Sequence, residues 1–250
     1  MIDQPCPVCA NISTPLDVVD FNKSCIEQKG MYLPFAGIPV YYYLCDYCGF
    51  CFSPELYSWP IEDFKTKIYN DDYITVDPDY VDLRPRQNSV NIAKMFINHK
   101  SMIRHLDYGG GSGLFSQLMC DQGFDSLSYD PFIDGKLKSQ DLGKFNLITA
   151  FEVFEHVPSV DELKNDLSSL LTDDGIILFS TLLSDENIKR HQRLTWWYAS
   201  PRNGHISLYS RKSLTIIAAR EKLSFGSFSA GFHAYWRTVP TWASHIIKLS

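Results

Sequence analysis

The chain has 250 residues, of which 45% are hydrophobic and 21% charged, a composition that can bury a sizeable core and excludes a disordered chain. Its 23 basic and 29 acidic side chains give a formal net charge of −6. This balance argues against the broad basic face of proteins that follow a phosphate backbone, and the length fits one or two domains.

Cysteines are concentrated near the N-terminus, where six of the seven fall within the first 51 residues. Residues 1–10 contain neither a basic stretch nor an apolar one, and no apolar run approaches the roughly 18 residues of a membrane-spanning helix. We therefore expect a cytoplasmic protein without a membrane segment. Disulfides do not persist in that compartment, so clustered cysteines there indicate metal binding.

Two C-x-x-C pairs, Cys6 with Cys9 and Cys45 with Cys48, form the strongest pattern in this region. Each pair presents two thiolates on a tight turn, and two pairs complete a tetrahedral site for one zinc ion. Either Cys25 or Cys51 could replace one ligand, and buried free thiols are the alternative. Because four thiolates leave no open coordination position, we expect the zinc to be structural.

In chain order, residues 1–58 favour short strands and turns, which we interpret as a small zinc-binding module. Residues 59–99 form a connector in which aspartates alternate with tyrosines, and a helix is predicted over 87–98. The connector is either a solvated segment or a lid over a pocket. Segments typical of strands and helices then alternate through residues 100–250, the predicted second domain.

The alternation predicts strands at 102–107, 124–130, 145–151 and 176–181, and two more strands over 224–239. One helix is predicted to end at residue 122, a second to follow a capping box at Ser159, and a third to span 210–223. Asp174–Gly175 is expected to form a turn, and 131–144 leaves room for little more than another. The pattern predicts an α/β fold whose mostly parallel sheet has helices on both faces.

A glycine segment, Leu106-Asp-Tyr-Gly-Gly-Gly-Ser-Gly113, joins the first of these strands to a helix. Glycines let backbone amides approach a ligand, and a helix N-terminus attracts a carboxylate. The spacing does not fit the dinucleotide fingerprint, and Asp107 at the strand end favours a ligand with an ammonium group. S-adenosylmethionine carries both groups, and Asp130 after the second strand can bind its ribose hydroxyls. A tight turn without a ligand is the alternative.

Residues 100–235 resemble the class I S-adenosylmethionine-dependent methyltransferases. The resemblance rests on the glycine segment, on Asp130 and on Phe151-Glu-Val-Phe-Glu-His-Val157, which is similar to the small-molecule branch of that family. It implies a Rossmann-like sheet preceded by the zinc-ribbon-like module. The family also has an acid that contacts adenine, for which Asp141 is the candidate, although the shortened segment after Asp130 departs from the family pattern. The implied cofactor-binding residues are Asp107, Gly109, Gly111, Gly113, Asp130, Asp141 and Glu152.

Methyl transfer to a hydroxyl or a carbon acid requires the acceptor to lose a proton, a task that suits histidine. His205 lies in Pro201-Arg-Asn-Gly-His-Ile-Ser-Leu-Tyr-Ser210, which resembles a segment of sugar C-methyltransferases, and we expect it to be the general base. His156 is the second candidate, with Glu155 and Tyr209 orienting or assisting. Either histidine could instead make only structural hydrogen bonds.

A small polar molecule is the expected acceptor. Residues 44–54 resemble the zinc modules of bacterial sugar methyltransferases, which suggests a nucleotide-linked or glycan sugar, and Trp196-Trp197-Tyr198 could stack on it or simply pack. Two alternatives stay open. The shortened 131–144 segment favours a non-catalytic scaffold that binds zinc and cofactor, whereas an RNA methyltransferase would fit poorly with a net charge of −6. The sequence does not indicate the methylated atom or the oligomeric state.

Overall fold

The computed structural model describes residues 2–134 and 139–247. The chain forms two compact units, and each unit is assembled from segments that are far apart in the sequence. The first contains Met1–Pro78, Phe154–Asp161 and Leu182–Ile217, and the second contains Asp79–Val153, Glu162–Thr181 and Ala218–Ser250. Two stretches from the second half of the sequence thus belong to the same unit as the N-terminal strands.

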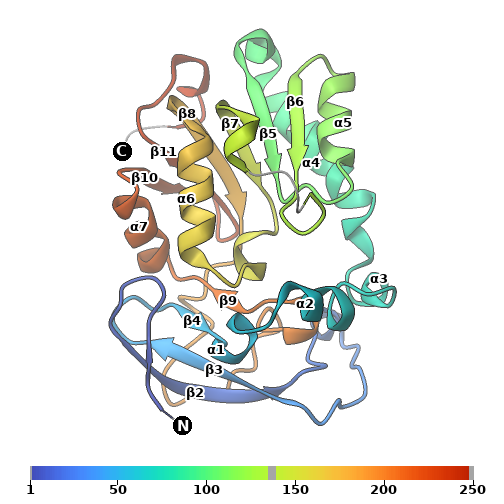
Figure 1. Ribbon diagram of the computed structural model, residues 1–250, viewed down its shortest axis with the longest axis vertical. Coiled ribbons are helices and arrows are strands. Elements are labelled where there is room, and N and C mark those ends of the chain that lie inside the picture. Colours follow the sequence, from blue (N-terminus) through green and yellow to red (C-terminus); the bar gives the residue numbers. More distant parts are fainter. Residues whose placement is uncertain (1, 135–138, 248–250) are drawn as a thin grey trace. The chain divides into compact units, whose positions relative to one another are not determined.

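The second unit is built on a six-stranded sheet (Figure 1) whose strands are β5 (Arg104–Tyr108), β6 (Asp125–Tyr129), β7 (Phe145–Ala150), β8 (Leu171–Ser180), β10 (Ser224–Ser227) and β11 (Phe232–Trp236). Their order is β10-β11-β8-β7-β5-β6. The four strands from β6 to β8 are parallel, whereas β11 and β10 are antiparallel to their neighbours. The predicted mostly parallel sheet is therefore confirmed.

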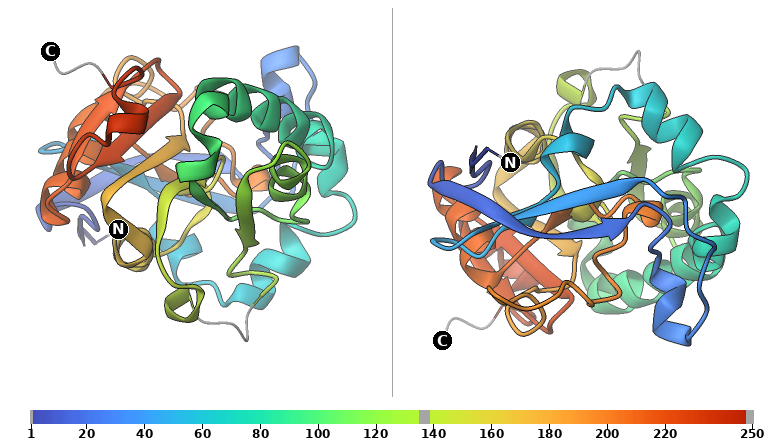
Figure 2. Two further views of the ribbon diagram at one scale, coloured as in Figure 1. Left: turned by 90° about the horizontal axis from the view of Figure 1, so that it is seen from above. Right: turned by 90° about the horizontal axis from the view of Figure 1, so that it is seen from below.

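The principal helices are α4 (Leu83–Phe96), α5 (Leu114–Asp121), α6 (Val160–Leu170) and α7 (Arg211–Arg220). One face of the sheet packs against α4 and α5 through a buried core that includes Phe96, Phe115 and Leu178. Viewed from above in Figure 2, these green helices and the gold helix α6 lie on opposite sides of the sheet, as predicted. β7 is almost completely buried because both of its faces are covered.

One local prediction is wrong. Asp174 and Gly175 do not form a turn before a strand, because β8 begins at Leu171 and contains them. The chain is tightly packed there, since a Cβ on Gly175 would come within 2.6 Å of Leu171 Cδ1. The pairing of β7 with β8 also shifts its register in this stretch, between Phe145 and Leu147. A local irregularity of the strand thus accounts for residues that the sequence pattern assigned to a turn.

The other predicted elements occur close to their expected positions. The connector helix α4 begins at Leu83 instead of residue 87. Within the segment expected to be short, Ser139–Leu142 form one 3₁₀ turn, and residues 135–138 lie outside the described residues. In the part of the chain that the structure describes, no helix is both long and apolar enough to cross a membrane.

The first unit contains an antiparallel sheet of five strands in chain order: β1 (Gln4–Pro5), β2 (Ile12–Asp20), β3 (Pro39–Cys45), β4 (Cys51–Phe52) and β9 (Ser207–Leu208). β9 pairs with β4 although Phe52 and Ser207, which form one of their two register pairs, are 155 positions apart in the sequence. Three short helices follow β4, namely α1 (Pro54–Tyr57), α2 (Ile61–Lys67) and α3 (Tyr73–Val76). The strands and turns predicted for the N-terminal region are confirmed, but β2 with nine residues and β3 with seven are longer than the short strands expected.

Polar contacts attach the segment 182–217 to this antiparallel sheet. Asp17 on β2 accepts hydrogen bonds from Arg193 Nε at 2.8 Å and from Leu194 N at 2.7 Å. Arg190 pairs with Asp46 at 2.9 Å and also donates to the Leu44 carbonyl of β3 at 2.9 Å. These bonds satisfy backbone and carboxylate groups of both segments, so the later stretch of chain is an integral part of the first unit.

Candidate functional site

The glycine segment leaves β5 and enters α5 with three residues in the left-handed region, where φ is 75° at Gly109, 55° at Gly111 and 79° at Gly113. A Cβ on Gly110 would come within 2.5 Å of Asp107 Oδ2, so this position also requires glycine. Among the described residues nothing lies within 4 Å of the position that a Cβ of Gly111 would occupy. The loop therefore presents backbone amides beside open space, as a ligand-binding loop must.

Asp107 is the buried acid at the end of β5, with 4% of its surface exposed. Burial raises the pKa of this carboxyl to about 7; a hydrogen bond from Thr149 Oγ1 at 3.1 Å opposes the rise, and the charge of Asp130 adds to it. An ammonium group bound next to this carboxyl would offset the cost of burying its charge. Asp107 is therefore suited to hold a cationic ligand group.

Asp130 directly follows β6 and contacts the glycine loop. Its Oδ2 accepts a hydrogen bond from Gly111 N at 3.0 Å, and its Oδ1 accepts one from Phe132 N at 2.8 Å. Each carboxylate oxygen keeps a second lone pair, so Asp130 can also accept hydrogen bonds from ligand hydroxyls. The two acids expected to bind the cofactor thus lie at the ends of neighbouring strands of the same sheet.

Glu152, two residues beyond β7, has a φ of 53°, which is unusual for a residue other than glycine. Ser180 at the end of β8 fixes it, because Glu152 N donates to Ser180 Oγ at 2.8 Å and this hydroxyl donates to Glu152 Oε1 at 2.7 Å. Backbone strain held in place by neighbours is common at functional sites. Asp141, in contrast, is exposed in the 3₁₀ turn Ser139–Leu142, and its contact with adenine stays a prediction.

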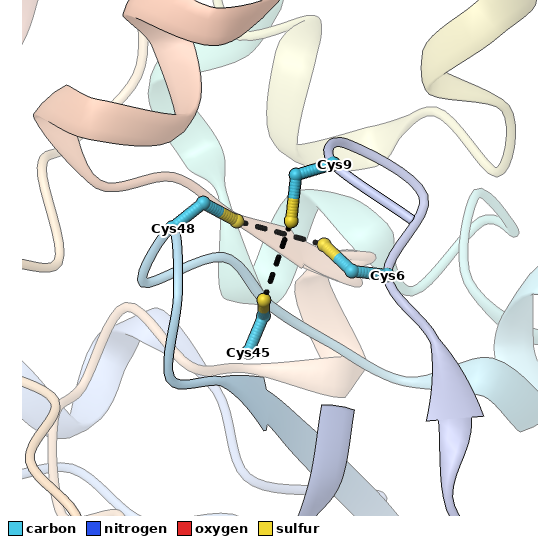
Figure 3. A group of neighbouring side chains, drawn as sticks. All are labelled: Cys6, Cys9, Cys45 and Cys48. Carbon is cyan, nitrogen blue, oxygen red and sulfur yellow. Dashed lines mark hydrogen bonds between the residues drawn. The ribbon is translucent and has the colours of Figure 1, made fainter. Parts of the chain in front are cut away.

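The four cysteines of the two C-x-x-C pairs converge on one point (Figure 3). Cys6 Sγ lies 3.5 Å from Cys48 Sγ, and Cys9 Sγ lies 3.5 Å from Cys45 Sγ. Sulfurs bound to one zinc at about 2.3 Å stand about 3.8 Å apart in a regular tetrahedron. The observed separations are close to this value, so the cluster fits a tetrahedral metal ion.

Each pair lies on a turn of the same geometry. Ala10 follows the first pair with φ of 61°, and Gly49 follows the second with φ of 73°. Ala10 N donates to Cys6 O at 2.9 Å, and Gly49 N donates to Cys45 O at 2.8 Å. Both pairs therefore present their sulfurs in the same way, on two turns that come from different parts of the sheet.

Hydrogen bonding and burial shift the thiol pKa values of the cluster in opposite directions, and the hydrogen bond with Cys6 raises the pKa of Cys48. A hydrogen bond from the Cys48 thiol lowers the pKa of Cys6 to about 5, whereas burial raises the pKa of Cys45. The two cysteines that could have replaced one of these ligands, Cys25 and Cys51, lie outside the cluster. Cys51 is buried in β4, and Cys25 Sγ lies 3.0 Å from Ser200 Oγ. The structure thus selects Cys6, Cys9, Cys45 and Cys48 as the group that could hold a metal ion.

His205 is 4% exposed, and hydrogen bonds hold both its backbone and its ring. Its backbone N donates to Ser200 O at 3.2 Å, and its carbonyl accepts a bond from Tyr42 Oη at 2.6 Å. Its ring Nδ1 lies 2.8 Å from Tyr198 O. Because a carbonyl can only accept, Nδ1 carries the proton and Nε2 of the neutral ring keeps its lone pair.

His156 and Glu155 lie beside this ring. The rings of His156 and His205 are 4.8 Å apart between centroids and nearly perpendicular, with an interplanar angle of 73°. Glu155, which is fully buried, has its Oε1 at 4.0 Å from His156 Nε2 and accepts a hydrogen bond from Tyr198 Oη at 2.5 Å. The structure therefore brings together three of the four residues expected to act in proton transfer.

Tyr209, the fourth, is completely buried and packs between Phe50 and Phe154. Its hydroxyl donates to Phe154 O at 3.1 Å, a contact that supports the turn preceding Glu155. A part in proton transfer stays a prediction for this residue. Trp196 is likewise buried and packs against Tyr198, with ring centroids 5.1 Å apart.

Two tyrosines contact this cluster in a way that the sequence did not indicate, since Tyr198 was considered only for stacking or packing. Tyr69 Oη lies 3.1 Å from His156 Nδ1, and Tyr198 contacts both Glu155 and His205. Gly204 leaves space for the contact between Tyr69 and His156, since a Cβ on Gly204 would come within 3.0 Å of Tyr69 Oη. The alternation of tyrosine with aspartate in the connector was the only sequence signal for Tyr69.

Comparison with known families identifies the chain. Residues 80–221 match the sequence model of a family described as a methyltransferase domain. The match covers more than half of the 250 residues, so the chain belongs to this family and is an S-adenosylmethionine-dependent methyltransferase. A search among curated proteins finds no match.

Several solved methyltransferase structures are similar in fold. An O-methyltransferase family protein from Burkholderia thailandensis is 12% identical with a TM-score of 0.47; the match covers 65% of this chain and spans 58% of that protein. DesVI from Streptomyces venezuelae is 13% identical with a TM-score of 0.45, over 71% of this chain and 98% of the other. Magnesium protoporphyrin IX methyltransferase from Synechocystis, solved with bound SAH, is 13% identical with a TM-score of 0.45, over 71% and 97%.

Proposed function

We propose that this methyltransferase acts on a small polar acceptor, with a nucleotide-linked or glycan sugar as the leading candidate and His205 as the general base. The observation that carries the proposal is the state of the His205 ring. Its Nδ1–H is fixed by Tyr198 O at 2.8 Å, which leaves Nε2 as a base inside a buried cluster with His156 and Glu155. A positioned neutral imidazole of this kind can take a proton near neutral pH.

The cofactor would be held by the second unit. S-adenosylmethionine, when bound, supplies an electrophilic methyl group. Asp107 would pair with its ammonium group, and the amides of the loop with Gly109, Gly111 and Gly113 would receive its carboxylate. Asp130 would accept the ribose hydroxyls, Glu152 would line the site, and Asp141 would contact adenine. The open space at Gly111 and the buried carboxyl of Asp107 support this assignment.

The acceptor proton would leave through the histidine cluster. His205 Nε2 would take the proton from the acceptor hydroxyl or carbon acid, and the electron pair released would form the new bond to the methyl carbon. The bond between that carbon and the sulfonium sulfur would break at the same time, and the sulfur would leave with its electron pair as a neutral thioether. The resulting imidazolium would lie close to the Glu155 carboxylate, since donor atoms of the two residues are within 4.8 Å of one another, and the negative charge of Glu155 would offset its positive charge.

The four-cysteine cluster would hold one structural zinc ion. Its four thiolates fill a tetrahedral coordination shell, so the metal has no open position at which an acceptor could bind. The sulfur separations of 3.5 Å support this assignment. Zinc would join the two equivalent turns and thereby order the N-terminal edge of the antiparallel sheet.

A methyl-transfer assay tests the function. Purified protein is incubated with S-adenosylmethionine labelled in its methyl group and with sugars linked to thymidine, uridine or guanosine diphosphate, free glycans, or total RNA. We expect label in a sugar, and we expect His205→Gln to lower its transfer about 10²- to 10⁴-fold without a change in the Kd for S-adenosylmethionine. His191→Gln, an exposed histidine of the same unit, is the matched control.

Other outcomes would reject specific parts of the proposal. Full turnover by His205→Gln would exclude His205 as the base. Label in RNA, with binding that weakens steeply as salt rises, would replace the sugar by a nucleic acid. If the protein binds S-adenosylmethionine but labels no acceptor in any class, the non-catalytic scaffold becomes the better description.

A further inference from the structure

We propose that Tyr198 is a positioning residue that sets the protonation of the histidine cluster through two separate contacts: its carbonyl fixes the tautomer of His205, and its hydroxyl holds the Glu155 carboxylate beside the two rings. This inference takes its significance from the proposed general base, and it concerns a residue that touches neither cofactor nor acceptor in the proposed mechanism.

The geometry places Tyr198 at the centre of the cluster. It is 3% exposed, and its ring lies 4.2 Å from the His205 ring between centroids. Its carbonyl oxygen accepts from His205 Nδ1 at 2.8 Å, while its hydroxyl donates to Glu155 Oε1 at 2.5 Å. One residue therefore contacts both the base and the acid of the cluster.

The carbonyl contact determines which ring nitrogen can accept a proton. A carbonyl oxygen has no hydrogen to donate, so His205 must present Nδ1–H to it and keep its lone pair on Nε2. The adjacent Cys25 Sγ, at 3.8 Å from the same nitrogen, is a much weaker partner. Since the contact uses the main chain, it does not depend on the Tyr198 side chain.

The hydroxyl contact determines where negative charge lies. A hydrogen bond to a carboxylate favours its charged form, and Glu155 is fully buried, where an ionised group needs such support. The ionised carboxylate in turn favours protonation of a neighbouring histidine, and its Oε1 lies 4.0 Å from His156 Nε2. Other titratable groups also contact the two histidines: Tyr69 on the connector and Cys25 lie at their rings, and Tyr42 on β3 donates to the His205 carbonyl.

Nitrogen-15 NMR of the whole protein labelled at histidine tests both contacts without requiring the acceptor. Signals are assigned with His156→Gln and His205→Gln, and the rings are titrated from pH 5 to pH 9. We expect the parent to show His205 as the Nδ1–H form. In Tyr198→Phe this tautomer should persist, but the histidine pair should titrate about 1 pH unit lower, because the weakened carboxylate no longer stabilises an imidazolium.

Two further variants make the test decisive. Tyr108→Phe removes the same kind of bond from another buried tyrosine, which donates to Asp166 at 3.0 Å, and should leave the histidine titration unchanged. Glu155→Gln keeps an acceptor for the Tyr198 hydroxyl but removes the charge, so it should reproduce the downward shift even if Tyr198→Phe fails to fold. An Nε2–H tautomer in the parent, or an unshifted titration in Glu155→Gln, would overturn the proposal. Neither result depends on turnover, so a failed methyl-transfer assay remains a separate finding.

Discussion

At the residue scale, the two groups to which we assign cofactor binding and proton transfer, Asp107 and His205, are both buried but have different hydrogen-bond environments. The carboxyl of Asp107 is desolvated, so its pKa is raised to about 7 and a cationic ligand becomes its natural partner. The ring of His205 is equally buried, but backbone hydrogen bonds fix its position and its tautomer. The charged form of Asp107 is therefore destabilised until a cationic ligand binds, whereas His205 is already held in position and in one tautomer before a ligand binds.

Cofactor binding should depend on pH through Asp107. Since its pKa is about 7 in the free protein, the carboxyl must lose a proton before it can pair with an ammonium group. We expect the affinity for S-adenosylmethionine to fall as pH decreases below 7, by up to about tenfold per pH unit. Calorimetric titration at pH 5.5, 6.5, 7.5 and 8.5 measures this, and an equally tight Kd at pH 5.5 and 8.5 would contradict it.

The Asp107→Asn variant separates binding from stability. The folded-state pKa lies above the usual value of 3.8, so this group's contribution to folding is greatest at low pH and is lost as pH rises from about 4 to about 7. A displacement from 3.8 to about 7 corresponds to about 4 kcal/mol as an upper limit. We expect Asp107→Asn to bind the cofactor weakly yet to unfold at higher denaturant concentration than the ligand-free parent at pH 8.

Local motifs made part of the site predictable at this scale. Asp107, Asp130 and His205 each occur in a short segment whose residue types indicate their chemistry. The partners of the histidines carry no such signal, because Tyr69 is 87 residues from His156 and Tyr198 is 43 residues from Glu155 in the sequence. Only the fold brings these pairs within hydrogen-bonding distance.

At the element scale, the two cysteine turns have one geometry but different residues at the left-handed position. Gly49 adopts φ of 73° without a side chain, whereas Ala10 adopts φ of 61° with a Cβ that this region disfavours. The spacing of the cysteines was sufficient to predict both turns. The strain at Ala10 was not predictable, since alanine itself gives no indication of a positive φ.

Exchanging these residues should have opposite effects on stability. Ala10→Gly relieves the left-handed strain and should raise the free energy of unfolding by about 0.5 kcal/mol after the entropy of glycine is counted. Gly49→Ala should lower it by more than 1 kcal/mol, on the order expected for φ strain, because its Cβ would also come within 2.9 Å of Ser210 Cβ. Denaturant unfolding of both zinc-loaded variants provides the measurement, and a destabilised Ala10→Gly would refute the strain.

At the scale of the whole molecule, the alternation of strands and helices predicted the main sheet, because each element carries its own hydrophobic period. The membership of the first unit was not visible in this way. β9 joins the N-terminal sheet through two register pairs, Cys51 with Leu208 and Phe52 with Ser207. Strands this short produce no hydrophobic pattern in the sequence. Sequence periodicity therefore predicts elements well but gives little information on such distant pairings.

Metal content tests the assignment of the cysteines for the complete protein. We expect one zinc ion per chain by elemental analysis, its loss in Cys6→Ser, and its retention in His205→Gln. Removal of the ion should lower the unfolding temperature, because the two cysteine turns would then be joined by sulfur–sulfur hydrogen bonds in place of four metal–sulfur bonds. A second ion that disappears in His205→Gln would instead place a metal among Glu155, His156 and His205, whose donor atoms also lie within 4.8 Å of one another.

The interleaving of the first unit from Met1–Pro78, Phe154–Asp161 and Leu182–Ile217 has a consequence for how such an enzyme can change. The residues that we propose for proton transfer lie in the two later stretches, yet they belong to the same unit as the N-terminal strands. A recombination that exchanges only one continuous piece of the gene would separate them from the residues that hold them. New acceptor specificity should therefore arise through point substitutions or through coordinated exchange of all three stretches, and libraries for redirecting the enzyme should vary them together.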